Sequence, residues 1–515
     1  MASAALAMYS PLPLPLVPVT TALATPAPWA GARYKSDEPR GGAGTYFPGP
    51  RDAGAVGIFR AYDIRGIYPG ELGPELALRI GLAYGSIASG RGVRGIYLGR
   101  DARLSGPALA AAFSAGAMAS GLEVVDVGLV HTPLIYWLTA REGGRGMEGV
   151  MVTASHNPPE YNGLKVSHGG MAYSYGDLYG EVERALAGGG PAPLPWDRAG
   201  SRSQEDRLGE YLEDLLGRAP RPERGLRAVV DSSNGSCWFA RDAMLRAGIS
   251  AMALNSEPDG RFPRHPPDPL REEAYSDASE AVRREGADFG VVFDGDCDRV
   301  GFVDESGRPI GGDAAAMILA RDVLSRRPGS KVVLNVMMSG AVVDYVRSLG
   351  GTPIMVRVGH SFIQEAMAAE GAAFAAEISG HLYFSDHYGF DDALYAALRF
   401  AAAISREGEP LSRIVASLPR YHSSPEQRVP CPDDLKFRVV EELRRRYEAE
   451  GLRVIPIDGV RVEVEDGWWI IRASNTEPAI VMRAEARDEG ALARISSRMR
   501  SDLEEALRSL GTAGR

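Results

Sequence analysis

Short runs of apolar, often β-branched residues alternate with alanine-rich helical stretches from about residue 57 onward. The run 97–99 precedes a predicted helix over 104–120, and the run 123–127 precedes another near 133–141. A third apolar run, 149–152, completes the first round. Strands separated by helices of this length are typical of βαβ units. The alternation therefore predicts an α/β fold.

The same pattern returns twice and then changes. The second round has predicted strands at 226–230, 250–254 and 289–293, with a helix over 239–247. The third has strands at 332–336, 353–356 and 372–375, with helices at 342–349 and 362–369. Beyond about residue 430, the predicted elements are helices near 433–451 and 488–511 and strands around 453–472 and 479–485. This last stretch indicates a smaller α+β unit.

The length of the chain requires several hydrophobic cores, because 515 residues are too many for one. We expect three successive α/β domains with mixed, largely parallel sheets and a C-terminal α+β domain. Their predicted limits are 55–204, 205–312, 313–428 and 429–515. Residues 1–54 are rich in proline and alanine and carry no charge before Arg33. We expect them to form a disordered extension, or to reflect a start codon placed too far upstream.

Composition excludes several classes of protein. The net charge of −10 argues against nucleic-acid binding. The sequence has no run of 18 apolar residues, so we expect no transmembrane helix. The three cysteines, Cys237, Cys297 and Cys431, form no CxxC pair and no recognisable disulfide framework. We therefore expect a reducing, cytoplasmic location. The sequence implies no obligate protein partner.

Reactive side chains follow two of the predicted strands. Ser155 lies in a turn rich in Asn, Pro and Gly directly after the apolar run 149–152. Asp294, Asp296 and Asp298 follow the run 289–293 in the same way. Three carboxylates at alternate positions suit a hard cation such as Mg²⁺ or Ca²⁺. A serine and an aspartate triplet, both at strand ends, point to metal-assisted phosphoryl chemistry.

A calcium-binding EF-hand loop is the rival explanation of the aspartates. Asp294, Asp296 and Asp298 fit its positions 1, 3 and 5, and Glu305 fits position 12. Position 6 is Arg299, however, where that loop needs glycine for a sharp turn, and the flanking residues indicate strands. The EF-hand is therefore excluded. We interpret Cys297 as a small filler residue, because a thiolate suits Mg²⁺ poorly.

Two further segments complete an ordered set of four: Glu-Ile-Ser-Gly-His at 377–381 and Arg-Ala-Ser-Asn-Thr at 472–476. With all four in this order, the chain resembles the α-D-phosphohexomutases, most closely the phosphomannomutase/phosphoglucomutase branch. The resemblance covers nearly everything from Gly57 to the C-terminus. It implies that the four domains are arranged around a central cleft where these four loops converge.

The resemblance implies roles for the first two motifs. Ser155 would be phosphorylated in the active enzyme and would donate its phosphate to the sugar. One Mg²⁺ per chain would be held by Asp294, Asp296, Asp298 and an oxygen of the Ser155 phosphate. Arg299 would contact the phosphate of the sugar. The reaction would pass through a hexose 1,6-bisphosphate, which also acts as an activator.

The remaining motifs would recognise the phosphosugar. Glu377 and Ser379 match the loop that binds the 3- and 4-hydroxyls, which sit the same way in glucose and mannose. Arginine binds phosphate bidentately, so the segment after 469–471 is predicted to be a phosphate clamp. Its members are Arg472, Ser474, Asn475 and Thr476, with Arg483 in support. Glu477 stands where threonine is often found, and should point away from the phosphate.

Several residues are assigned to the cleft by their place in the motifs. Tyr62 and Arg65 belong to the opening motif Phe-Arg-Ala-Tyr-Asp-Ile-Arg-Gly at 59–66. Lys165 is a candidate for proton transfer, because lysine, unlike arginine, can titrate there. His360 is a second candidate for the catalytic set, and His381 for contact with the substrate.

The sequence thus predicts an enzyme that interconverts hexose 1-phosphates and 6-phosphates of mannose, glucose or both. A phosphoglucosamine mutase is an alternative, although Ile378 stands where that branch usually carries glutamine. A phosphopentomutase of the same superfamily also remains open. From other classes, the alternatives are a non-catalytic sugar-phosphate sensor and a metal-dependent phosphatase.

Overall fold

Four β-sheets organise residues 57–142, 146–474 and 478–512, which the computed structural model describes. Three sheets combine parallel with antiparallel strands, and the pairings of the fourth are antiparallel. The predicted fold class, three α/β units followed by an α+β unit, is confirmed. These residues belong to one compact unit, Phe47–Arg515.

The first sheet has the order β1-β5-β4-β2-β3-β7, with β6 paired to β5. Its strands are β1 (Ile64–Ile67), β2 (Gly95–Arg100), β3 (Glu123–Leu129), β4 (Met147–Val152), β5 (Tyr161–His168), β6 (Met171–Ala172) and β7 (Arg202–Gln204). Its helices are α1 (Pro74–Gly90), α2 (Gly106–Ala119), α3 (Thr132–Glu142) and α4 (Gly180–Ala187). Successive residues of β4 face opposite cores: Val150 and Val152 pack with α1 and α2, and Met151 packs with α3.

The second sheet, in the order β12-β11-β10-β8-β9, comprises β8 (Arg227–Asp231), β9 (Ser250–Leu254), β10 (Phe289–Phe293), β11 (Val300–Asp304) and β12 (Pro309–Ile310). Its helices are α5 (Leu208–Arg218), α6 (Ala240–Arg246) and α7 (Ser276–Glu285).

The third sheet, in the order β14-β13-β15-β16, comprises β13 (Lys331–Asn335), β14 (Thr352–Val356), β15 (Phe374–Ala376) and β16 (Leu382–Phe384). Its helices are α8 (Gly312–Arg326), α9 (Gly340–Ser348), α10 (His360–Glu370), α11 (Ala393–Glu407) and α12 (Leu411–Ser417). One hydrophobic core runs from α3 through both sheets to α8 and α11.

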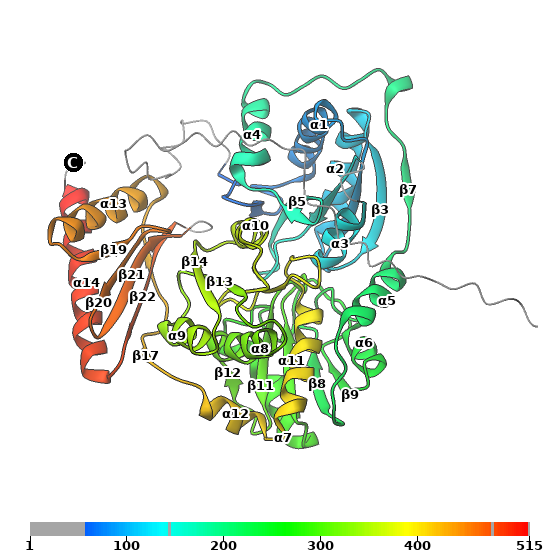
Figure 1. Ribbon diagram of the computed structural model, residues 1–515. Helices are drawn as coiled ribbons and strands as arrows, with labels where there is room; N and C mark the ends of the chain where they lie inside the picture. The colour runs from blue at the N-terminus through cyan, green and yellow to red at the C-terminus, as the bar shows by residue number, and fades with distance from the viewer. Residues whose placement is uncertain (1–56, 143–145, 475–477, 513–515) are drawn as a thin grey trace, which may run out of the picture. The chain divides into compact units, whose positions relative to one another are not determined.

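The fourth sheet, in the order β17-β22-β21-β20-β19 with β18 paired to β22, has its own core. Its strands are β17 (His422–Ser423), β18 (Gln427–Pro430), β19 (Arg453–Ile455), β20 (Val460–Val464), β21 (Gly467–Ala473) and β22 (Ala479–Ala486). Helices α13 (Asp433–Ala449) and α14 (Glu489–Thr512) pack together against this sheet (Figure 1).

The sequence missed several elements. Helices α1, α8 and α11 were not predicted, and neither was β5. Helix α11 is buried along nearly its whole length, so it lacks the polar face that marks a surface helix. Strand β5 has few apolar residues, so it lacks the pattern by which strands are predicted. Several of its polar side chains, such as Asn162 and Lys165, are buried. The proposed domain limits stay predictions.

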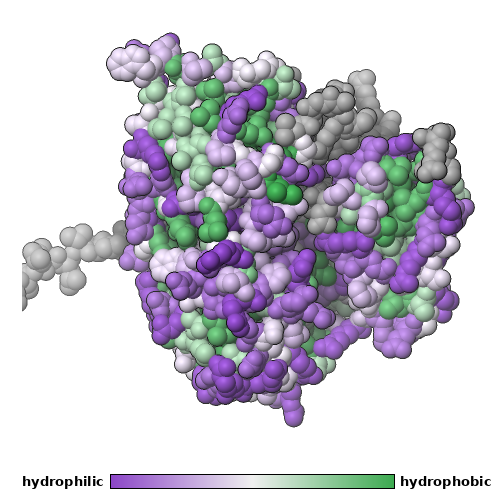
Figure 2. Space-filling model, turned by 180° about the vertical axis from the view of Figure 1, so that it is seen from behind, coloured by the Kyte–Doolittle hydropathy of each residue, from purple (hydrophilic) through white to green (hydrophobic). Residues whose placement is uncertain are grey.

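Hydrophilic residues cover most of the described surface on the face shown in Figure 2, and hydrophobic residues appear there in small groups. Among residues 57–142, 146–474 and 478–512, no helix combines the length and the apolar character needed to cross a membrane.

Candidate active site

Ser155 lies in the loop that connects β4 to β5. Its backbone is left-handed, with a φ of 51°, and the residue is 1% exposed. The Ser155 amide donates a hydrogen bond to Thr153 Oγ1 at 2.8 Å, and the Ser155 hydroxyl donates to Asp294 Oδ2 at 2.8 Å. The predicted nucleophile and the first predicted metal ligand, 139 residues apart, are therefore in direct contact.

Asp294, Asp296 and Asp298 form a fully buried cluster at the end of β10. Ligand atoms of the three carboxylates all lie within 4.8 Å of one another. Burial, together with repulsion from Asp298 and Asp296, raises the pKa of Asp294 well above its ordinary value. The flanks of the loop are strands β10 and β11, which agrees with the exclusion of the EF-hand.

Lys165 reaches this cluster from β5. Its Nζ lies 2.8 Å from Asp296 Oδ2 and 2.5 Å from Asp298 Oδ2. Burial opposes the charge on the lysine, but the two carboxylates outweigh burial and raise its pKa above the ordinary value. Burial likewise opposes the charge on Asp298, and its cationic neighbours, Lys165 first, hold the pKa of Asp298 below its usual range. Both groups are therefore charged in this arrangement.

The aspartate cluster fits a hard cation. Asp296 Oδ1 and Asp298 Oδ1 are buried and have no hydrogen-bond partner within the described protein. An unpartnered buried carboxylate oxygen is costly unless a cation or donor joins it. The donor set consists of oxygen atoms, as Mg²⁺ prefers.

A cavity of about 970 Å³ adjoins the cluster and is lined by loops that follow strands of all four sheets. The predicted residues that line it are Tyr62, Arg65, Ser155, Lys165, Arg299, His360, Glu377, Ser379, His381, Arg472, Ser474 and Arg483. The three aspartates are not part of the lining but contact two residues that are: Asp294 contacts Ser155, and Asp296 and Asp298 contact Lys165. Asn475 and Thr476 lie outside the described residues.

The lining is strongly cationic. Its basic residues are Arg65, Lys165, Arg264, Arg271, Arg299, Arg428, Arg472 and Arg483, against the acidic residues Asp268, Glu377 and Glu426. A protein with a net charge of −10 thus places eight basic residues around one cavity, against three acidic ones. Such a cavity suits a ligand with phosphate groups.

Glu377 and His381 lie on either side of the turn between β15 and β16. Glu377 Oε1 accepts hydrogen bonds from Asn335 Nδ2 and from the Gly359 amide, each at 3.1 Å. Arg299 Nε donates to His381 Nε2 at 2.9 Å, so that ring nitrogen carries no proton. The other ring nitrogen of His381, Nδ1, lies 2.7 Å from Asp391 Oδ2.

His360 and Tyr62 meet at the start of α10, with ring centroids 5.0 Å apart. Burial, and the charge of Lys165, lower the pKa of His360 well below its ordinary value, so its ring is neutral near pH 7. His360 Nε2 has no partner within the described protein. Burial raises the pKa of Tyr62 to about 12. Arg65 donates to Asn157 Oδ1 in the serine loop at 2.5 Å.

The predicted phosphate clamp is held by two charged neighbours. Arg472 Nε donates to Asp458 Oδ2 at 2.8 Å, and Arg472 lines the cavity. Lys436 Nζ donates to the Ser474 carbonyl at 2.6 Å. Arg483 contacts the Met337 carbonyl and lies 3.1 Å from Asp313 Oδ2, so this arginine also joins the third and fourth sheets.

Four sequence models of one family match the chain. They are described as phosphoglucomutase/phosphomannomutase, and cover α/β/α domain I at residues 56–175, domain II at 209–307, domain III at 311–421 and the C-terminal domain at 426–501. The chain belongs to the phosphoglucomutase/phosphomannomutase family. It is a mutase of the α-D-phosphohexomutase superfamily, and hence an isomerase.

Relatives of the family are similar over most of their length. The phosphomannomutase/phosphoglucomutase of Pseudomonas aeruginosa is 37% identical over 453 residues, 87% of this chain and 95% of the relative. A Methanopyrus kandleri protein named "Probable phosphoglucosamine mutase" is 38% identical over 434 residues, 84% of this chain and 94% of the relative. The crystal structure of a phosphoglucomutase/phosphomannomutase family protein from Burkholderia thailandensis has a TM-score of 0.79 and 37% identity. The matched region covers 88% of this chain and 98% of the chain in that crystal structure.

Sequence reasoning missed part of the lining of this family member's cavity. His156 and Asn157 adjoin Ser155, and the loop 262–271 contributes Arg264 and Arg271. Four prolines in that loop, at 263, 266, 267 and 269, are a turn signal that could have drawn attention to it.

The cysteines require a correction. Cys237 and Cys297 form a buried disulfide, whereas their spacing in the chain predicted no disulfide framework and Cys297 was interpreted as a filler. Strands β8 and β10 are parallel neighbours, so the loops after them meet at one edge of the sheet. This pairing brings together two cysteines that are 60 residues apart.

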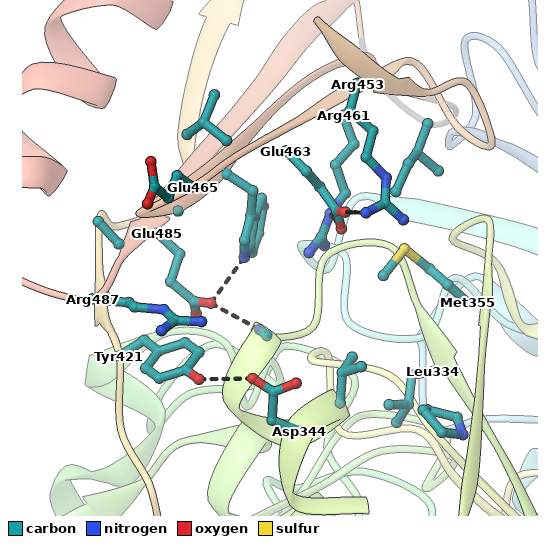
Figure 3. Close-up of a pocket in the computed structure, with 18 of the residues that line it drawn as sticks. Leu334, Asp344, Met355, Tyr421, Arg453, Arg461, Glu463, Glu465, Glu485 and Arg487 are labelled. Atoms are coloured by element: carbon teal, nitrogen blue, oxygen red, sulfur yellow. Dashed lines mark hydrogen bonds and ion pairs between the residues drawn. The ribbon is translucent and has the colours of Figure 1, made fainter. Parts of the chain in front are cut away.

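A second cavity, of about 400 Å³, lies between α9 and β14 of the third sheet and strands of the fourth (Figure 3). Its charged groups are largely engaged with each other. Tyr421 donates to Asp344, Arg453 pairs with Glu463, and Glu485 accepts from Trp468 and from the Gly340 amide. None of the predicted site residues among those described lines this cavity.

Proposed function

We propose that the chain interconverts the 1-phosphates and 6-phosphates of mannose and glucose, with Ser155 as the residue that carries the transferred phosphoryl group. The observation that carries this proposal is the contact of 2.8 Å between Ser155 Oγ and Asp294, beside a cavity whose lining holds eight basic and three acidic residues. Phosphoryl transfer needs a positioned nucleophile and concentrated positive charge, and both are present. Family membership supports the same reaction.

Asp294, Asp296 and Asp298 would hold one Mg²⁺ per chain, together with an oxygen of phosphorylated Ser155. When bound, the ion neutralises charge that develops on the phosphoryl group in transfer. The unpartnered buried oxygens of Asp296 and Asp298 support this assignment.

The substrate is proposed to bind with its non-reacting phosphate at the clamp of Arg472, Ser474, Asn475 and Thr476. Glu377 and Ser379 would hold the 3- and 4-hydroxyls, and Tyr62, Arg65, Arg299 and His381 would line the remaining contacts. After the first transfer the hexose 1,6-bisphosphate turns end for end, and its other phosphate returns to Ser155. The clamp must therefore accept a phosphate from either orientation of the sugar.

Protons must move between the cavity and the hydroxyl of the sugar that accepts or releases the phosphoryl group. We assign this role to Lys165 and His360. The neutral ring of His360 can accept a proton at Nε2. Lys165 is charged, and Asp296 and Asp298 oppose the loss of its proton by raising its pKa, so donation from Lys165 requires that these carboxylates be neutralised, as a bound cation would do.

The test is an isomerisation assay with Mg²⁺, a trace of glucose 1,6-bisphosphate, and the 1-phosphates of mannose, glucose and glucosamine in parallel. We expect 6-phosphates of mannose and glucose to form, with no net release of inorganic phosphate and no activity in excess EDTA. Steady release of phosphate without isomerisation would favour a phosphatase. Binding without turnover would favour a non-catalytic sensor.

A phosphoglucosamine mutase is the second candidate, because the relative from Methanopyrus kandleri is about as similar as the phosphomannomutase/phosphoglucomutase from Pseudomonas aeruginosa. Rapid turnover of glucosamine 1-phosphate alone would select it.

The cytoplasmic location, and the absence of an obligate partner protein, stay predictions from the sequence.

A further inference from the structure

We propose that Arg103 is a positioning residue for phosphoryl transfer: its guanidinium holds the backbone of the 155–161 loop in the shape that presents Ser155 to the cavity. This inference rests on the proposed function of Ser155. Arg103 itself does not line the cavity and so acts through the serine loop.

The side chain of Arg103 uses all of its donor groups on one loop and one carboxylate. Its Nη2 donates to the carbonyls of Ser155 at 2.7 Å and Asn157 at 2.6 Å. Its Nη1 donates to the carbonyls of Pro158 at 2.5 Å and Tyr161 at 3.0 Å. Its Nε donates to Asp101 Oδ2 at 3.1 Å. A guanidinium has five N–H donors in a fixed plane, and each has an acceptor here.

Four carbonyls that converge on one point would repel each other without such a donor. The loop also holds Ser155 in the left-handed region, which is unfavourable for a residue other than glycine. Arg103 is 1% exposed, so water does not replace its hydrogen bonds. The strained shape of the loop is therefore supported by a side chain from outside the loop as well as by local hydrogen bonds.

Asp101 orients the guanidinium and ties it to the serine. Asp101 Oδ1 accepts from the Arg103 amide at 2.9 Å, and Oδ2 accepts from Thr153 Oγ1 at 2.6 Å. Thr153 Oγ1 in turn accepts from the Ser155 amide. A chain of hydrogen bonds thus runs from Arg103 through Asp101 and Thr153 to the backbone of Ser155.

Loops that follow strands of the second sheet pack closely against Arg103 and the serine loop. Phe262 lies over the Arg103 guanidinium, 5.1 Å from ring centroid to Cζ. A Cβ added at Gly260 would meet the Arg103 Cα at 2.4 Å, and one added at Gly295 would meet the Ser155 carbonyl oxygen at 2.6 Å. Gly295 lies between Asp294 and Asp296, so the backbone that Arg103 shapes is also the surface against which the aspartate loop packs.

The experiment compares Arg103→Met and Arg103→Lys with a matched control, Arg399→Met. Arg399 is also a buried arginine, 2% exposed, and pairs with Asp322 and Asp386 away from the cavity. For Arg103→Met we expect kcat to fall about 100-fold, as for a reacting group misplaced by about 1 Å. KM for glucose 1-phosphate should stay within about threefold, because Arg103 makes no contact with the cavity.

The variants should differ in phosphorylation and backbone protection as well. After incubation with glucose 1,6-bisphosphate, intact mass should show much slower loading of Ser155 in Arg103→Met than in wild type. Arg103→Lys should recover part of the rate, because an ammonium can supply at most three of the five hydrogen bonds. Amide hydrogen exchange over residues 154–163 should quicken in both variants and stay unchanged in Arg399→Met.

Several outcomes would overturn the proposal. One is a folded Arg103→Met with kcat and loading within threefold of wild type. Another is a loss of kcat no larger than in an Arg399→Met variant with the same fall in Tm. If neither Arg103 variant folds, Thr153→Val decides: a tenfold or greater loss of kcat at unchanged KM supports the chain of hydrogen bonds, and normal turnover refutes it. If wild type itself lacks mutase activity, the proposed function fails, and hydrogen exchange of the loop alone judges the role of Arg103.

Discussion

At the scale of single residues, the position of Ser155 makes the sharpest prediction. Ser155→Ala should lower turnover by several orders of magnitude and remove a species about 80 Da heavier than the bare chain, because the phosphoryl acceptor is lost. Intact mass and the isomerisation assay would check both effects. Ser114→Ala is the control, since Ser114 is also buried, its hydroxyl has no partner within the described protein, and it lies in α2. Full activity of Ser155→Ala would remove the serine from the mechanism.

Arg472 offers a second test at this scale. Arg472→Lys keeps the charge but loses the two-pronged geometry that suits phosphate. Charge-assisted hydrogen bonds contribute roughly 1.5–3 kcal/mol, so kcat/KM should fall about 10- to 150-fold. The loss should be alike for glucose and mannose 1-phosphates, because the proposed clamp would contact the phosphate and not the sugar ring. Arg453→Lys, at an arginine whose side chain is 77% exposed, should change little. Strong discrimination between the two sugars would show that this loop reads the ring instead.

At the scale of elements, a buried histidine whose ring has no hydrogen-bond partner within the described protein stands directly before α3. His131 packs against Tyr211 and Phe239, and neither ring nitrogen has a hydrogen-bond partner within the described protein. Burial lowers its pKa from 6.5 to about 4. Below pH 6.5 the unfolded chain takes up this proton first, so the folded state loses stability as the pH falls towards 4.

The consequence can be measured by comparing wild type with His131→Phe. Denaturant unfolding between pH 7 and pH 4 should show wild type losing up to roughly 3 kcal/mol more than the variant, given 1.36 kcal/mol for each pKa unit. His422→Phe, at an exposed histidine, is the control for the substitution itself. Parallel curves for wild type and His131→Phe would mean that His131 does not carry this pH dependence.

At the scale of the whole molecule, the cavity joins residues that follow strands of all four sheets, so a ligand bound there should stabilise them together. Glucose 1,6-bisphosphate at 100 times its Kd should add about 2.7 kcal/mol to the free energy of unfolding. Scanning calorimetry with increasing ligand should show a rising Tm. Glucose without phosphate is the control and should have no effect at the same concentrations. Equal shifts from glucose and the bisphosphate would show that the cationic lining does not select for phosphate.

Local patterns in the sequence determined much of this protein. The alternation of apolar runs and helical stretches predicted the fold class, because the periods of strands and helices depend on residues close in the chain. Strand β10 and strand β9 appear at the predicted residues. The four motifs pointed to one family, since each kind of chemistry needs its own residue types at the end of a strand.

Contacts between distant segments were decided by the tertiary structure. Lys165 meets Asp298 across 133 residues only because β5 turns its polar side chain inward, and a polar strand has no apolar pattern to announce it. The disulfide of Cys237 and Cys297 depends on the parallel pairing of β8 with β10. Arg103, in a loop after β2, has no local signal for this role, because four of its five acceptors are carbonyls of the serine loop and become neighbours only when that loop folds over it. Sequence determines which groups are available, and packing determines which of them meet.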